Sequence, residues 1–60
     1  SWPDVSLSQV TELLTRQAER EMIAAALART GGNRSQAARL LRINYKTLYY
    51  KIRRLEIPAS

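Results

Sequence analysis

The second half of the chain concentrates the side chains that could do chemistry. Residues 31–60 carry seven Lys or Arg against one acid, a net charge of +6, whereas residues 1–30 carry three Arg against four acids, a net of −1. Three tyrosines, Tyr45, Tyr49 and Tyr50, lie within the same basic segment. Clustered cations attract polyanions, and exposed aromatic rings contact apolar groups, so this segment predicts a surface that binds phosphates and bases.

The side chains needed for most catalysis are missing from the sequence. The chain has no Cys and no His, which excludes disulfides, thiolate nucleophiles, imidazole acid–base chemistry and the usual zinc sites. The five carboxylates are not near a Gly-rich phosphate loop or in a paired-acid pattern; they are Asp4, Glu12, Glu19, Glu21 and Glu56. We therefore expect no enzyme activity, no catalytic residue, no metal and no cofactor.

Length and hydropathy limit the number of domains and the cellular location that we expect for the chain. At 60 residues it forms one domain at most, with a marginal core that a partner copy or DNA would help to stabilise. No apolar run approaches the roughly 20 residues of a membrane span, and the N-terminus lacks a signal pattern, so we expect a cytoplasmic protein without a membrane partner. Since the chain begins at Ser1 and not at Met, we expect it to be a piece of a longer protein.

The first half predicts one long helix over about residues 6–30, preceded by the end of a linker at residues 1–5. Trp2 and Pro3 favour a linker, and Ser6 is a suitable N-cap. Apolar residues recur at helical spacings of three and four; they are Leu7, Val10, Leu14, Ala18 and Met22, before Ile23, Ala26 and Leu27 resume a buried face. The stretch 15–21 has only Ala18 as an apolar residue, which leaves a break into two helices open. Gly31 and Gly32 end the helix.

Two shorter helices follow, over about residues 34–41 and 45–55. Asn33 and Gln36 have the spacing of a capping box, and Asn44 is a second N-cap. Leu48, Ile52 and Leu55 form the buried stripe of the last helix, which ends before Pro58. A short helix, a tight turn and a basic helix is the helix-turn-helix plan, so residues 6–60 predict an all-α DNA-binding domain with a long N-terminal helix.

The stretch TGGNRSQAARLLRINYKTLYYKI, residues 30–52, carries a family resemblance. It resembles the C-terminal DNA-binding domains of the NtrC family, activators that work with the sigma-54 form of RNA polymerase, and the nucleoid protein Fis. The resemblance extends without a gap from Leu7 to Ile57. It implies a Fis-type three-helix domain, the output domain of a bacterial, nucleoid-associated response regulator. It also implies a homodimer on a pseudo-palindromic enhancer or operator, with sigma-54 RNA polymerase as a partner of other domains.

The sequence departs from the pattern of these relatives at two places. Arg42 stands where they usually have Gly in the turn. A non-Gly residue in the left-handed region costs on the order of 1 kcal/mol, so either this strain is tolerated or the turn differs. Relatives also often have Arg early in the last helix, where this chain has Tyr45 and Tyr49. Since Arg reads guanine through two hydrogen bonds and Tyr offers one hydroxyl and a flat ring, a guanine-reading rule does not transfer to this chain.

Helix geometry and the docking of the helix-turn-helix assign the residues of this motif to two roles. At 100° per residue, Lys46, Tyr50 and Arg53 lie nearly opposite Leu48. The residues expected to read base edges are Asn44, Tyr45, Lys46, Tyr49 and Tyr50. Those expected on the DNA backbone are Asn33, Arg34, Ser35, Arg42, Thr47, Lys51, Arg53 and Arg54. Tyr45 also fits half-buried packing, and Asn33 and Asn44 also fit a capping role alone.

The apolar N-terminal end of the long helix predicts a two-fold dimer. The expected interface consists of Leu7, Val10, Leu13, Leu14 and Ala18. These side chains could instead join the core of their own chain, but two short helices offer little surface to cover them. The alternative function is a helical interaction module whose basic face meets acidic proteins or lipids. A steep salt dependence and a base-sequence preference would distinguish DNA binding from this alternative.

Overall fold

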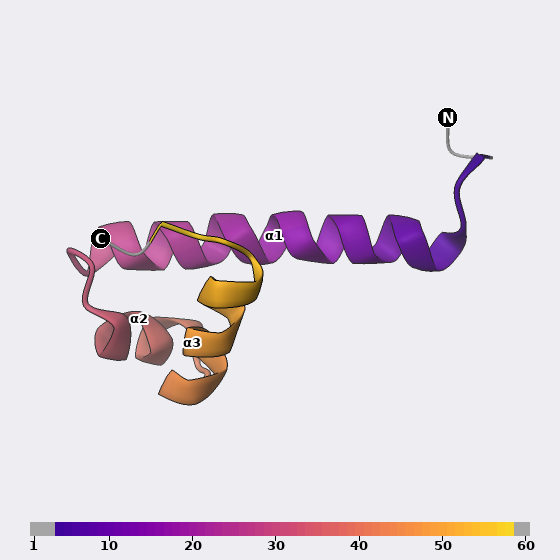
Figure 1. Ribbon diagram of the computed structural model, residues 1–60. Coiled ribbons are helices and arrows are strands. Elements are labelled where there is room, and N and C mark those ends of the chain that lie inside the picture. The colour runs from indigo at the N-terminus through magenta and orange to yellow at the C-terminus, as the bar shows by residue number, and fades with distance from the viewer. Residues whose placement is uncertain (1–3, 59–60) are drawn as a thin grey trace.

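The described residues form three helices and no strand, which confirms the predicted all-α fold. The structure is a computed structural model that describes residues 4–58. The helices are α1, Leu7–Arg29, α2, Arg34–Leu41, and α3, Tyr45–Arg54 (Figure 1). Trp2 and Pro3, expected in a linker, lie outside the described residues. Within residues 4–58 no helix is both long and apolar enough to cross a membrane.

Helix α1 is one continuous helix of 23 residues, so the alternative of a break at residues 15–21 is wrong. Ser6 caps its start with a reciprocal capping box: the Gln9 amide donates to the Ser6 hydroxyl at 3.2 Å, and the Ser6 amide donates to the Gln9 side chain at 2.9 Å. We expected a box of this kind at Asn33 and Gln36 instead. At the start of α2 the structure has one of the two hydrogen bonds of a capping box: the Gln36 amide donates to the Asn33 side chain at 2.9 Å.

Each helix ends in the same backbone motif. A residue in the left-handed region is followed by one whose amide reaches back five residues, which satisfies carbonyls that the helix end would leave unpaired. The three closing hydrogen bonds run from Gly32 to Leu27, from Ile43 to Ala38 and from Ile57 to Ile52, at 2.8, 3.0 and 3.1 Å. The chain therefore changes direction within a few residues after every helix.

Only the first of these turns uses glycine. Gly31 has φ 63°, whereas the equivalent positions after α2 and α3 are Arg42, with φ 58°, and Glu56, with φ 53°. Of the two alternatives left open for Arg42, the structure has the left-handed conformation, and Glu56 repeats it at a position that the sequence did not single out. The residues that follow, Ile43 and Ile57, pack on the core, which offsets the torsional cost of the two turns.

The core lies where α2 and α3 cover the C-terminal half of α1. It consists of Ile23, Ala26, Leu27, Ala37, Ala38, Leu48, Ile52, Leu55 and Ile57, with Leu41 and Ile43 partly buried against it. Ala37 and Leu48 are fully buried, so the two short helices meet around one small and one large side chain. Leu41 is half-buried at the edge of the core, whereas Ile57 is buried although it lies beyond the predicted stripe of the last helix.

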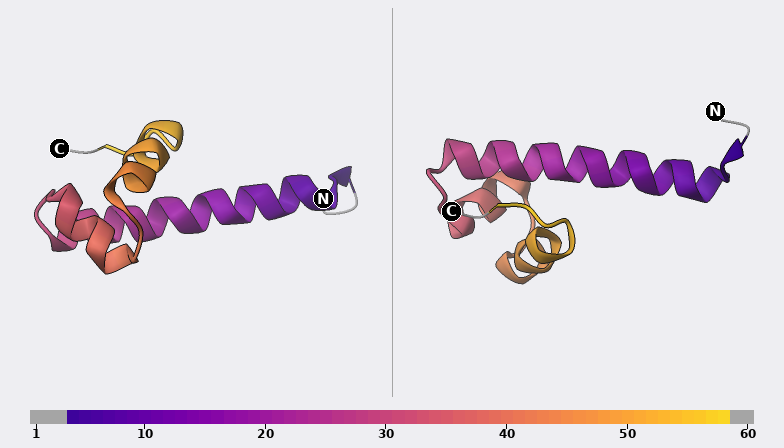
Figure 2. Two further views of the ribbon diagram at one scale, coloured as in Figure 1. Left: turned by 90° about the horizontal axis from the view of Figure 1, so that it is seen from below. Right: turned by 45° about the horizontal axis from the view of Figure 1, so that its top comes forward.

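The N-terminal half of α1 projects beyond this core. Twenty-three helical residues span about 34 Å, and the molecule measures 41 × 18 × 17 Å along its principal axes. Figures 1 and 2 show α2 and α3 packed beside the C-terminal half of α1 only. The stripe expected to continue to Met22 is uncovered in the single chain, where Met22 is 61% exposed.

Replacing Arg42 by Gly should keep or raise stability, by up to about 1 kcal/mol, because glycine adopts the left-handed region without torsional cost but adds entropy to the unfolded chain. Glu56→Gly is the matched control at the equivalent turn after α3. Thermal melts of the three proteins measure both changes. A clearly lower midpoint for Arg42→Gly, with Glu56→Gly unaffected, would mean that Arg42 makes a stabilising contact that outweighs its strain.

Candidate nucleic-acid interface

Helix α3 has one buried and one exposed face. Leu48 and Ile52 are 0% and 6% exposed and face the core. The helix begins at the end of the molecule farthest from α1 and runs back toward α1, as Figure 1 shows from its colour change. Its N-terminal turns are therefore the most protruding part of the helix-turn-helix, which is the part of a recognition helix that approaches base edges in this motif.

Aromatic and basic side chains occupy the exposed face of α3. Tyr45 is 49% exposed and Tyr50 57% exposed, and Lys46 and Arg53 are exposed as well. This places Lys46, Tyr50 and Arg53 on the side of α3 opposite Leu48, as the 100° rotation predicts. Tyr45 is neither buried nor fully free, so the structure leaves both of its predicted roles open.

Tyr49 joins its neighbours in a small cluster. Its ring meets that of Tyr50 edge to face, with centroids 5.5 Å apart and planes at 71°. The Arg53 guanidinium lies 5.8 Å from the Tyr49 ring centroid and donates to the Tyr49 hydroxyl at 3.1 Å. Stacking and the hydrogen bond together restrict the orientation of the guanidinium. The reading role given to Tyr49 and the anchoring role given to Arg53 are therefore physically coupled.

The residues at the helix starts act as caps. The Asn44 side chain accepts a hydrogen bond from the Thr47 amide at 2.7 Å, and the Asn33 side chain accepts one from the Gln36 amide in the first turn of α2. Their side-chain oxygens are used by the backbone, which leaves the amide nitrogens of the two side chains as donors. Next to the caps, Ser35 is exposed while Arg34 and Thr47 are half-buried. DNA contact by these residues remains a prediction.

Two cations of α3 are bound within the chain. The Lys51 ammonium lies 2.6 Å from one oxygen of Glu19, and the Arg54 guanidinium lies 3.3 Å from the other. Sequence reasoning assigned both to the DNA backbone and gave no role to Glu19. The available signal was the position of Glu19, four residues before the buried Ile23 on the core-facing side of α1.

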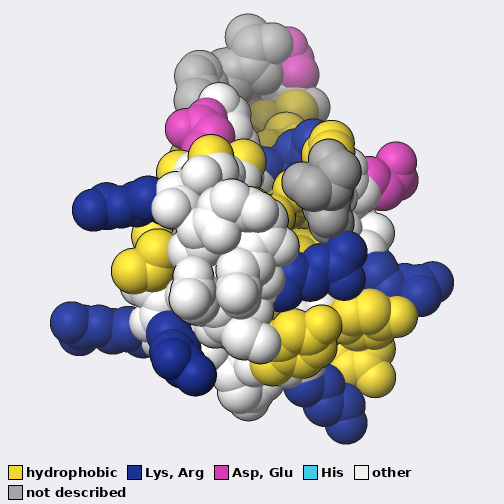
Figure 3. Space-filling view, turned by 90° about the vertical axis from the view of Figure 1, so that its left-hand side faces the viewer, with side chains coloured by type: hydrophobic (Ala, Val, Ile, Leu, Met, Phe, Trp, Pro, Cys, Tyr) yellow, Lys and Arg dark blue, Asp and Glu magenta, His cyan; other side chains and the backbone are white. Residues whose placement is uncertain are grey.

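Charge is segregated over the molecular surface. In the face shown in Figure 3, Lys and Arg side chains surround the lower part, which α2 and α3 form, and apolar or aromatic side chains lie between them. Acidic side chains on this face lie at the upper part, toward α1. The exposed Arg42, at the turn between α2 and α3, adds a cation to the basic end. A surface of this kind attracts a polyanion to the helix-turn-helix end of the molecule.

This fold and this surface define a helix-turn-helix domain. Comparison with known proteins agrees: residues 15–55 match the family described as bacterial regulatory protein, Fis family. The chain belongs to this family, which confirms the resemblance found in the sequence, and its function class is DNA binding in transcription regulation.

A curated relative is the transcriptional regulatory protein ZraR of Klebsiella oxytoca. The chain is 55% identical to it over 38 residues, which cover 63% of this chain and 9% of that protein. The chain therefore corresponds to a small part of this relative. No solved structure matches the chain.

Two substitutions at Tyr49 test whether its ring contributes to the recognition of base sequence. Tyr49→Phe keeps the ring but removes the hydroxyl that holds Arg53, so it should weaken binding to all duplexes by a similar, small factor. Tyr49→Ala also removes the ring and should change which sequences are preferred, at a cost of roughly 1–3 kcal/mol at the affected base step. Gel-shift titrations on specific and random duplexes measure both effects. If the two variants acted identically on both duplexes, the ring of Tyr49 would have no part in reading.

Proposed function

We propose that this chain is the sequence-specific output domain of a bacterial transcription regulator and that α3 reads DNA in the major groove. The observation that carries the proposal is the exposed face of Tyr45, Lys46 and Tyr50 on α3, the helix whose N-terminal end lies farthest from α1. The major groove admits an α-helix, and its base edges present a pattern that differs for each base pair. Lysine offers donors to guanine, and tyrosine rings offer an apolar surface to thymine methyl groups.

Backbone contacts would come from cations that are free to reach phosphates. Arg34, Arg42 and Arg53 have no carboxylate partner within residues 4–58. The first amides of α2, after the Asn33 cap, present additional donors and the positive end of the helix dipole. These contacts would fix the register of α3 in the groove, and they carry no sequence information themselves.

We further propose a two-fold dimer through the N-terminal half of α1. Leu7, Leu13 and Leu14 are 83%, 63% and 57% exposed. Exposure of apolar side chains to water is unfavourable in free energy, and pairing with a second copy would bury them. Leu14 and Ile23 are nine residues apart, which is about two and a half helical turns, so they lie on opposite sides of α1. Leu7, Val10 and Ala18 share the Leu14 side, which leaves the core side unobstructed. Leu13 lies to the side of this stripe.

The two-fold axis would arrange two recognition helices on one face of the duplex. Half-sites about one turn of DNA apart, roughly 34 Å, would then read a pseudo-palindromic enhancer or operator. Because the chain corresponds to 9% of its relative, other domains of a longer protein would supply regulation. The resemblance to NtrC-family activators supports contact of those domains with sigma-54 RNA polymerase in the bacterial cytoplasm, at the nucleoid.

Binding to a selected duplex and to a random duplex, measured by fluorescence anisotropy between 50 and 200 mM salt, tests DNA reading. We expect log K to fall linearly with log salt, by about 0.9 for each phosphate neutralised, and the selected duplex to bind at least about 1,000-fold more tightly. Arg53→Ala should flatten the slope on both duplexes. Equal affinity for both duplexes would instead favour a general basic interaction module.

Sedimentation equilibrium tests the dimer. The wild type should associate at high micromolar concentration, and Leu14→Asp should stay monomeric because it places a charge in the apolar interface. Leu40→Asp is the matched control, since Leu40 is 53% exposed on α2 and outside the proposed interface. A monomeric wild type, together with a Leu14→Asp variant that binds the full operator equally well, would remove the dimer from the proposal.

A further inference from the structure

Glu19 is an acidic residue on the side of α1 that faces α3. It lies one helical turn before Ile23, which is 3% exposed, and its own side chain is 28% exposed. A carboxylate so close to a small core needs compensating partners, because partial burial removes much of its hydration. The partners come from α3, more than 30 residues away in the sequence.

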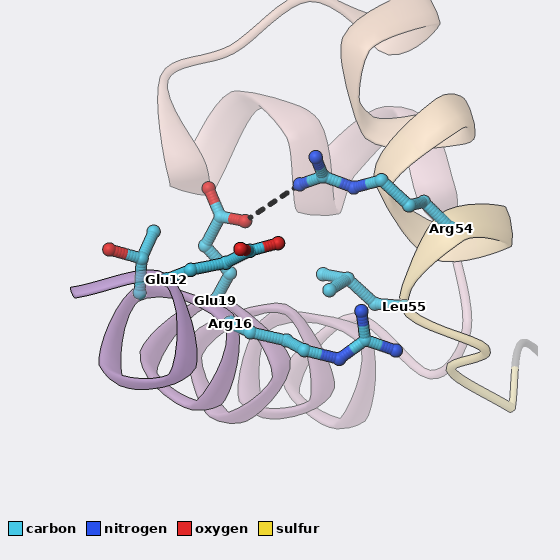
Figure 4. Close-up of a pocket in the computed structure, with 6 residues that line it drawn as sticks. Glu12, Arg16, Glu19, Arg54 and Leu55 are labelled. Atoms are coloured by element: carbon cyan, nitrogen blue, oxygen red, sulfur yellow. Dashed lines mark hydrogen bonds and ion pairs between the residues drawn. The ribbon is translucent and has the colours of Figure 1, made fainter. Parts of the chain in front are cut away.

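The two oxygens of Glu19 bind two different cations. Oε2 lies 2.6 Å from Lys51 Nζ, and Oε1 lies 3.3 Å from Arg54 Nη2. Figure 4 shows the Glu19 carboxylate and the Arg54 guanidinium extending toward each other across a pocket between α1 and the end of α3. Lys51 is also 28% exposed, so this ion pair is partly shielded from the solvent that weakens surface pairs.

A second tie from α1 acts on the same end of α3. Arg20 donates a hydrogen bond to the backbone carbonyl of Leu55, the residue that caps the C-terminus of α3. A cation is favourable there, because the carbonyls at a helix C-terminus carry partial negative charge. Neighbouring residues of α1 therefore fix the C-terminal turn of α3, whereas its N-terminal turns stay exposed.

We infer that Glu19 is a positioning residue that raises the specificity of DNA binding by withholding Lys51 and Arg54 from phosphates. The inference rests on the proposed DNA binding. Contacts to phosphates strengthen binding to every sequence alike, so two cations held by a carboxylate reduce the sequence-independent part of the affinity. The same carboxylate holds α3 in the orientation that presents Tyr45 and Tyr50. Under this proposal Lys51 and Arg54 would not contact the DNA backbone, which differs from the expectation drawn from the sequence.

Glu19→Gln tests the inference, with Glu12→Gln as the matched control. Glu12 lies two turns earlier on the same side of α1, lines the same pocket and has no ion pair within the described residues. Both variants change the net charge equally, so their difference isolates the release of the two cations. Glu19→Gln should steepen the salt slope on a random duplex by up to about 1.8, the value for two added phosphates, and lower the specific-to-random affinity ratio several-fold.

Arg54→Gln in the wild-type background provides a second measurement that does not depend on how Glu19→Gln folds. Arg54 is 65% exposed, so its replacement leaves the core intact. It should leave the salt slope of the wild type unchanged, and it should lower the slope of folded Glu19→Gln by about 0.9. The inference is overturned if Arg54→Gln lowers the wild-type slope by about 0.9, or if folded Glu19→Gln behaves like Glu12→Gln. If the wild type itself failed to bind DNA, the proposed function would be wrong. The salt slopes of the variants could then not be measured, so this failure is distinct from a failure of the inference about Glu19.

Discussion

The burial of Leu48 is the interaction on which the arrangement of the helix-turn-helix depends. Leu48 is fully buried on the inner face of α3, in a core that α1 and α2 complete. Truncating a buried leucine to alanine costs about 2–5 kcal/mol, whereas a whole domain is stable by only about 5–15 kcal/mol. Within residues 4–58 the buried residues form a single cluster, so no second core retains α3 if this contact is lost.

Close packing of α2 makes this burial possible. Ala37 and Ala38 are 0% and 3% exposed, and their small side chains let α2 approach its neighbours closely. The turn at Arg42 then redirects the chain so that α3 begins only a few residues after α2 ends. The left-handed conformation of Arg42 is therefore a cost imposed by the geometry of the motif, and the packing of Ile43 on the core offsets it.

Much of this organisation was predictable because it depends on neighbouring residues. The caps Ser6, Asn33 and Asn44 and the glycine after α1 mark the helix ends, and the spacing of Leu48 and Ile52 gives the buried side of α3. The outward direction of Lys46 and Arg53 follows from the same periodicity. Local hydrogen-bonding preferences and a period of 3.6 residues require no knowledge of distant contacts.

The features that sequence reasoning missed depend on contacts between distant segments. Glu19 and Lys51 are 32 residues apart, and nothing in their local sequence pairs them. Ile57 follows the last helix, so helical periodicity gives no reason to bury it; the left-handed turn at Glu56 directs it into the core. From the sequence alone, a basic residue on a helix is expected to be available for phosphates. The fold places the Glu19 carboxylate beside Lys51 and Arg54, which local sequence does not indicate.

The central claim is that the N-terminal turns of α3 lie in the major groove. Intermolecular nuclear Overhauser effects between the protein and a selected duplex test it most directly. The account predicts contacts from the ring protons of Tyr45 and Tyr50 to thymine methyl or cytosine H5 protons, which lie in the major groove. Contacts from these rings to adenine H2 protons in the minor groove, or DNA contacts confined to α1, would contradict it.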